Sequence, residues 1–270
     1  AKSRTMVERI IECVEGNEEA GELRAIAWCK LGIVSRRQGN VAEARDCFEH
    51  ALQHAGDDKK TISQALDHLG LLEFYQGNLL LGSEYFEKAL RVAEEIDNKE
   101  LSNAIRSNMA GVLRAQGDYE GAKELLTQSL AQACRAGLKR QEARCMNDLA
   151  ELDRFAGNLA AAESGYRQSM LIYSALGNQN STHIAALNLG QIYSETGRTN
   201  EARTELERAH QAVKVAGQPA LEAFALISLS LVYAQLGDLS GWEESFSEAG
   251  RMFEELGIVE VDVARTSALA

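Results

Sequence analysis

The sequence has a single proline and lacks the common signatures of catalysis. Pro219 is the only proline in 270 residues, so almost nothing in the chain interrupts an α-helix. No HExxH, GxSxG, phosphate-binding loop or Rossmann glycine pattern occurs. We therefore expect an all-α protein that is not an enzyme and uses no cofactor.

Charge and hydropathy argue against two classes of partner. The chain contains no run of 18 apolar residues and no signal peptide at its start, so we expect no membrane span. Its 40 acidic side chains outnumber 28 basic ones, which gives a net charge of −12. Such a surface repels a phosphate backbone, so we expect no binding to nucleic acid.

Cysteine and histidine offer little support for a disulfide or metal site. The five cysteines are scattered and none lies in a CxxC pair, which indicates free thiols and a cytoplasmic location. His50 and His54 stand four residues apart, a spacing that can place two ligands on one metal ion. Because no third ligand is evident in the sequence, we interpret them as surface histidines.

Six glycines recur along the chain and define its period. They are separated by 38 residues once and by 40 residues four times. Glycine tolerates the positive φ that ends a helix, and a following Asn or Asp can cap the next helix. Each glycine therefore predicts a tight turn between two antiparallel helices. The glycines are Gly39, Gly77, Gly117, Gly157, Gly197 and Gly237, and all but Gly197 precede Asn or Asp.

Small and bulky residues recur at fixed distances from these glycines. Seven residues before each glycine stands a small residue, preceded by a large apolar one. On the predicted second helix a small residue is followed, four residues later, by a bulky residue on the same face. We expect both sets to be core, because no repeat can bury its own apolar face. The small positions are Gly32, Gly70, Ala110, Ala150, Gly190 and Ser230, then Ala44, Gly82, Ala122, Ala162, Ala202 and, as an exception, Trp242. The bulky positions are Phe48, Phe86, Leu126, Tyr166, Leu206 and Phe246.

The first copy of this pattern resembles the tetratricopeptide repeat. Trp28-Cys29-Lys30-Leu31-Gly32 has the W-x2-L-G form, and Gly39, Ala44 and Phe48 follow at the family's spacing. The resemblance covers about residues 23–257 and implies a right-handed superhelical solenoid of about six helix-turn-helix repeats. The long period is similar to that of kinesin light chain, the Pins-type adaptors and the sensor region of the maltose-regulon activator.

We expect one solenoid over residues 1–270, with six repeats in 23–257. Residues 1–15 are either part of a preceding repeat or a capping helix, and residues 258–270 either a closing helix or a frayed tail. Since the chain starts at Ala1 inside this pattern, we expect it to be a piece of a longer protein. An exposed end of the array would allow a homodimer, which we keep as a minor alternative.

The resemblance implies that first-helix residues line a concave groove. In related peptide-binding arrays an asparagine just before the leucine of the first helix holds a ligand backbone. Asn108 and Asn188 occupy that position, and Asn147 lies one residue earlier in its repeat. An amide suits this role because it donates and accepts hydrogen bonds at once.

Arginines recur four residues after the small position of the first helix. Arg36, Arg114 and Arg154 would form a stripe that Arg144 extends, with Phe74 beside it as an apolar anchor. In an acidic protein such a stripe favours a partner segment that carries carboxylates. Alternatively, the arginines pair with nearby acidic residues: Asp148, Glu151 and Asp153.

We therefore predict a protein–protein interaction scaffold or regulatory module that binds a peptide or helix in its groove. It would belong to a larger cytoplasmic signalling or transcription protein. The alternative is a small-molecule sensor domain of a multidomain transcription activator or signalling protein. A sensor should contain a closed pocket lined with aromatic side chains.

Overall fold

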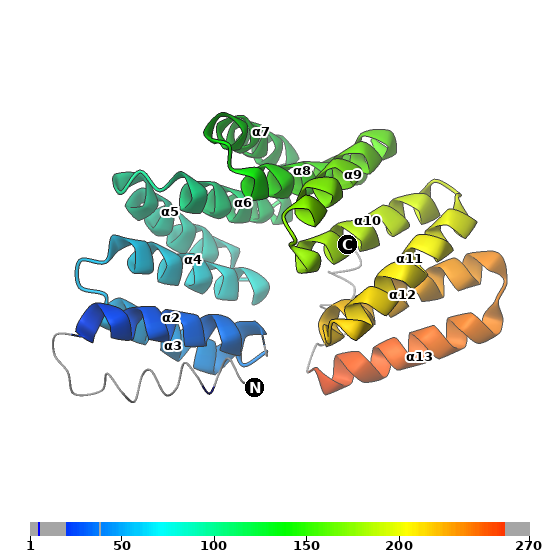
Figure 1. The fold of residues 1–270 in the computed structure, drawn as a ribbon, viewed down its shortest axis with the longest axis horizontal. Helices are drawn as coiled ribbons and strands as arrows, with labels where there is room; N and C mark the ends of the chain where they lie inside the picture. Colours follow the sequence, from blue (N-terminus) through cyan, green and yellow to red (C-terminus); the bar gives the residue numbers. More distant parts are fainter. Residues whose placement is uncertain (1–4, 6–19, 38, 257–270) are drawn as a thin grey trace. The chain divides into compact units, whose positions relative to one another are not determined.

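The computed structural model describes residue 5 and residues 20–37 and 39–256, and every element in these ranges is an α-helix. Twelve helices follow one another as six antiparallel pairs, one for each predicted repeat (Figure 1). The pairs are α2 (Gly21–Arg37) with α3 (Val41–His54), α4 (Lys59–Tyr75) with α5 (Leu79–Glu95), α6 (Lys99–Ala115) with α7 (Tyr119–Ala136), α8 (Lys139–Phe155) with α9 (Leu159–Ala175), α10 (Gln179–Glu195) with α11 (Thr199–Val215), and α12 (Pro219–Leu236) with α13 (Leu239–Glu255). The predicted all-α repeat solenoid is confirmed.

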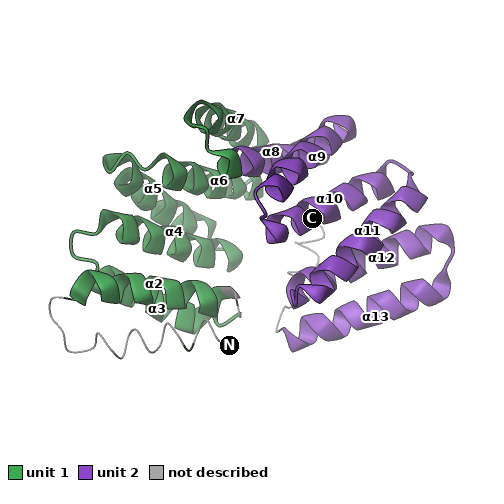
Figure 2. Cartoon of the chain, viewed as in Figure 1, with its two compact units in different colours: residues 1–141 green, residues 142–270 purple. Residues whose placement is uncertain are grey.

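The helices form two compact units, residues 1–141 and residues 142–270 (Figure 2). Buried aromatic rings mark the core of each: Phe48 and Phe86 in the first, Tyr166 in the second. A single continuous solenoid over the whole chain stays a prediction. The predictions for residues 1–15 and 258–270 lie outside the described part of the chain.

The turn glycines behave as predicted, but the caps do so only in part. All six have positive φ, from 75° at Gly197 and Gly237 to 84° at Gly117. Asp118 and Asp238 accept a hydrogen bond from the first turn of the next helix, as an N-cap should. Asn78 makes no such bond, because its amide instead donates to the carboxylate of Glu73 at 2.7 Å.

The small and bulky positions of the first five repeats form the predicted core. Phe48, Phe86 and Leu206 are fully buried, and each fills the space left by the small residue of its own first helix. A Cβ on Gly70, for example, would lie 2.8 Å from the ring of Phe86. The helices of a repeat therefore approach closely because one side chain there is missing.

The sixth repeat departs from this pattern, and the core prediction for its second helix is wrong. Trp242 is 40% exposed and Phe246 54% exposed, and their rings stack on each other at 5.9 Å. In the first, second, fourth and fifth repeats the next first helix packs against the bulky residue of the second helix, whereas the described chain ends one residue after α13.

Helix α12 is more apolar than the sequence led us to expect. By length and composition alone it is able to cross a membrane, with a mean hydropathy of 1.5. Its buried side chains pack against neighbouring helices, with Leu229 beside residues of α11 and Leu226 beside Phe253 of α13. A core helix passes the same test of length and composition, so α12 is weak support for a membrane span.

Candidate functional site

Polar side chains link the first helices of neighbouring repeats. Four such hydrogen bonds join residues that are 41 apart, which is one repeat plus one residue. Because the spacing recurs, these bonds hold successive first helices in register, and two of them, Arg154 with Glu195 and Ser194 with Gln235, occupy equivalent positions of the repeat. The pairs are Asn108 with Asp67, Gln141 with Glu100, Arg154 with Glu195, and Ser194 with Gln235.

In the first unit the predicted groove residues are half-buried. Asn108 donates to the buried carboxylate of Asp67 at 2.6 Å. Phe74 packs into the core cluster around Phe86 and meets the ring of Tyr75 edge-on. Arg36 and Arg114 are also half-buried, at the ends of α2 and α6. The sequence did not indicate a role for Asp67, because nothing in the repeat pattern distinguishes its position.

In the second unit two of the predicted arginines face carboxylates. Arg154 forms an ion pair with Glu195 of the next first helix at 2.6 Å. Arg144 lies 3.8 Å from Asp148, one turn along α8. Intramolecular carboxylates thus neutralise part of the predicted basic stripe, in one case within the helix and in the other across repeats.

Three polar atoms on α8 and α10 are buried without a hydrogen-bond partner. They are Oδ1 of Asn147, Nη1 of Arg154 and Oε1 of Gln191. Asn147 and Arg154 are seven residues apart and therefore share a helical face, and the Arg154–Glu195 pair joins that helix to α10. Asn188, on α10, is half-buried, and its side chain makes no hydrogen bond within the described ranges. A buried donor or acceptor without a hydrogen-bond partner is costly to the fold.

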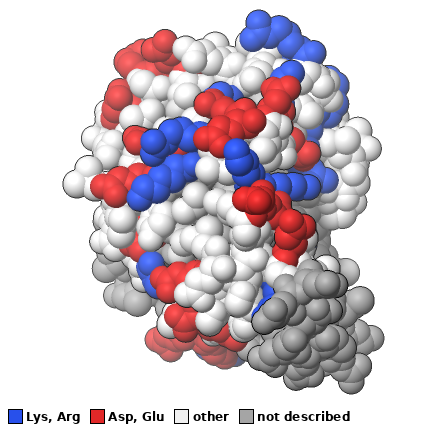
Figure 3. All heavy atoms as spheres, turned by 90° about the vertical axis from the view of Figure 1, so that its left-hand side faces the viewer, with Lys and Arg blue, Asp and Glu red and all other residues white. Residues whose placement is uncertain are grey.

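The surface itself mixes both signs of charge. Figure 3 shows acidic and basic side chains interspersed over one face of the molecule. Ion pairs also join helices of the first unit, such as Arg45 with the buried Glu73 and Lys59 with Glu95. The net charge of −12 therefore does not form one uniform acidic patch on this face.

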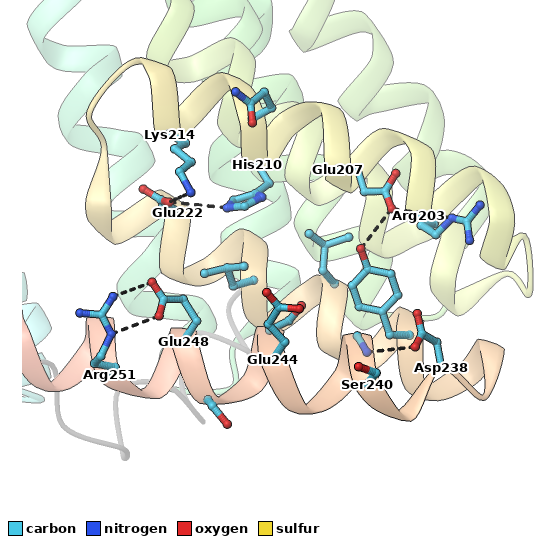
Figure 4. Close-up of a pocket in the computed structure, with 17 residues that line it drawn as sticks. Arg203, Glu207, His210, Lys214, Glu222, Asp238, Ser240, Glu244, Glu248 and Arg251 are labelled. Carbon is cyan, nitrogen blue, oxygen red and sulfur yellow. Dashed lines mark hydrogen bonds and ion pairs between the residues drawn. The ribbon is translucent and has the colours of Figure 1, made fainter.

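A pocket in the second unit was not predicted from the sequence. It has a volume of about 1140 Å³ and lies between α11, α12 and α13 (Figure 4). Leu226, Leu229 and Tyr233 of α12 line it, with charged side chains from α11 and α13 around them. Tyr233 is its one aromatic residue, so this pocket lacks the lining expected of the sensor alternative.

The histidines and cysteines suggest packing roles. The ring of His50 stacks on Trp28 at 4.7 Å and lies 6.4 Å from the ring of His54. Burial raises the pKa of the Cys29 thiol to about 12, which keeps it protonated and unreactive. The four cysteines of the described part are free thiols, and Cys13 lies outside it.

These features define an all-α helical-repeat scaffold, a class of protein that binds other proteins. The chain belongs to the tetratricopeptide repeat family. Family models described as tetratricopeptide repeat match residues 23–95, 61–135, 101–175 and 185–210.

A curated relative and two solved structures show how far the likeness goes. The chain is 26% identical over 185 residues to cellulose synthase 1 operon protein C of Komagataeibacter xylinus; the match covers 66% of this chain and 13% of that protein, so the chain spans a small part of its length. A Rap protein complexed with competence and sporulation factor has a TM-score of 0.73 at 18% identity, covering 88% of this chain and 66% of that one. The TPR-like repeats of a putative kinesin light chain from Podosopora anserina have a TM-score of 0.55 at 16% identity, covering 73% and 96%. At these identities the two structures show the fold alone.

Proposed function

We propose that this chain binds a peptide segment of a partner protein along the first-helix face of α8 and α10, as a non-catalytic part of a larger cytoplasmic signalling or transcription protein. One observation carries the proposal: α8 and α10, which the Arg154–Glu195 ion pair joins, both carry side-chain donors or acceptors that make no hydrogen bond within the described ranges. Arg154 offers a donor and Asn147 and Gln191 offer acceptors. An extended peptide backbone presents both N–H and C=O groups, so it complements this set where a purely anionic ligand does not.

In this proposal the site recognises the backbone of the peptide and not its charge. Arg144 and Arg154 already face Asp148 and Glu195. The solved Rap complex, named for its bound competence and sporulation factor, is consistent with ligand binding by a similar fold.

The test is selection of peptides from a random library displayed on phage against the full chain, followed by calorimetry with a selected peptide. Replacing Asn147 and Asn188 together by alanine should weaken binding of that peptide about thirtyfold, because each of the two lost hydrogen bonds to a backbone group is worth about 1 kcal/mol. The matched control is Asn200→Ala, which removes an exposed asparagine from α11. A selected peptide that binds the double variant as tightly as the parent would refute this site.

A further inference from the structure

The groove between second helices is filled in one repeat of the second unit and open in the next. In the earlier groove, between α9 and α11, the guanidinium of Arg198 lies over the ring of Tyr193, 4.3 Å from its centroid. The same guanidinium pairs with Glu163 at 2.5 Å, so one side chain from the turn before α11 spans the groove. Arg167 completes the set by donating to the hydroxyl of Tyr193 at 2.6 Å.

Forty residues later the tyrosine is kept and the spanning arginine is lost. Tyr233 stands at the position of Tyr193, but Asp238 replaces Arg198. The side chain of Asp238 is too short to reach across the groove. It caps α13 instead, because its carboxylate accepts a hydrogen bond from the backbone N–H of Gly241 at 2.9 Å. Tyr233 therefore lines the 1140 Å³ pocket, and no lysine or arginine among the described residues stacks on its ring as Arg198 does on Tyr193.

Small residues on α13 keep this space open. Gly241 and Ser245 line the pocket where the preceding second helix has Glu201 and Glu205. The α12 side is apolar, since Leu226 and Leu229 lie beneath the charged side chains. A long side chain with an aliphatic stem and a polar head fits such a space.

The charges of the pocket favour a cation. Glu207 accepts a hydrogen bond from the hydroxyl of Tyr233 at 3.1 Å and has only a loose ion pair with Arg203, at 3.8 Å. Glu244 reaches from α13 into the pocket (Figure 4) and makes no ion pair with a described residue. The other acidic groups are engaged: Glu248 pairs with Arg251 at 2.6 Å, and Glu222 lies 3.7 Å from Lys214. Two carboxylates beside a tyrosine ring are thus available to one incoming cation.

We propose that this pocket binds an arginine side chain of a partner protein. Its guanidinium stacks on Tyr233 and pairs with Glu207 and Glu244, and its stem lies on Leu229. The stacking on a tyrosine ring repeats what Arg198 does within the chain one repeat earlier, but the carboxylates differ, since Arg203 stands at the position of Glu163. A planar guanidinium is suited to both contacts, because it stacks on aromatic rings and binds carboxylates in a fork. The site is separate from the α8–α10 face, so either proposal can fail without the other.

The test is a nuclear magnetic resonance titration of the full ¹⁵N-labelled chain with N-acetylarginine amide. Saturable shifts are expected at Tyr233, Gly241 and Glu244, and N-acetylcitrulline amide, of the same shape but without charge, should cause none. Glu244→Gln should lower the affinity for the arginine probe at least fivefold. The control Glu243→Gln removes a neighbouring carboxylate that does not line the pocket, and it should leave that affinity unchanged. Equal shifts from the citrulline probe, no shift with arginine, or full affinity in Glu244→Gln would overturn the proposal.

Discussion

At the scale of single residues, Arg198 shows how a repeat can depart from its consensus and gain a contact between repeats. It is the one residue after a turn glycine that is neither Asn nor Asp, and it makes no side-chain cap for α11. Its guanidinium instead forms a pair of hydrogen bonds with Glu163 and covers the ring of Tyr193. A contact between repeats has thus replaced a contact at the helix end.

This contact predicts a pH-dependent stability. The hydrogen bond from Arg198 holds the pKa of Glu163 below its usual value, so the carboxylate stabilises the fold above its unfolded pKa and loses this effect as the pH falls through its folded pKa. Glu163→Gln should lower the free energy of unfolding by about 1 kcal/mol at pH 7. Urea unfolding measures the free energy of unfolding of the variant and of the parent. The difference between the two should become smaller as the pH falls below the ordinary glutamate pKa of about 4.3. Glu120→Gln, which changes an exposed glutamate, is the control. If the loss of unfolding free energy in Glu163→Gln stayed constant with pH, the lowered pKa of Glu163 would not be the source of its stabilising effect.

Residue-level contacts were the part least accessible from the sequence. The period located Asn108, Arg144 and Arg154 on the first helices, because helical spacing is regular. The period gave no information on their hydrogen-bond partners. Asp67 and Glu195 lie one repeat away, and each side chain has several acidic residues within reach as possible partners. Whether these residues bind a peptide stays a prediction.

At the scale of the helix, the spacing of small and bulky residues determines how two helices meet. Gly70 lies against the ring of Phe86, and Gly190 against Leu206, where a Cβ would come within 2.6 Å of the leucine side chain. The sequence could predict this because both partners recur in every repeat. It could not reveal that Trp242 and Phe246 would be exposed, since that depends on the helix that follows them and not on their own repeat.

The close approach predicts opposite effects for two glycine substitutions in one unit. Gly70→Ala should lower the free energy of unfolding by about 1–2 kcal/mol, because forcing a methyl group against the buried ring of Phe86 outweighs the gain in helix propensity. Gly111→Ala should raise it by about 0.5–1 kcal/mol, since its Cβ would meet only Phe74, at 3.9 Å. Thermal and urea unfolding measure both. Stabilisation by Gly70→Ala would show that the helices have room to separate.

At the scale of the whole chain, a helical-repeat protein is held together by contacts between neighbours. The buried clusters follow this rule: one joins Phe48 to Leu69 and Leu72 of the next repeat, and another joins Leu206 to Leu229. Stability is then a sum of local terms, and damage to one repeat should spread no further than the helices that touch it. The sequence predicted the period that makes this possible, while the division into units 1–141 and 142–270 became apparent only in the structure.

Two matched core substitutions test whether unfolding is local in this sense. Leu206→Ala removes a fully buried side chain from α11, and Phe86→Ala removes one from α5, each at a cost of about 2–5 kcal/mol. Hydrogen–deuterium exchange should become faster in α10, α11 and α12 for Leu206→Ala and in α4, α5 and α6 for Phe86→Ala, because the lost contacts lie there. Each variant serves as the control for the other. Faster exchange throughout the chain in both would mean that all six repeats unfold as one cooperative unit, and that neighbour contacts alone do not determine the stability of this array.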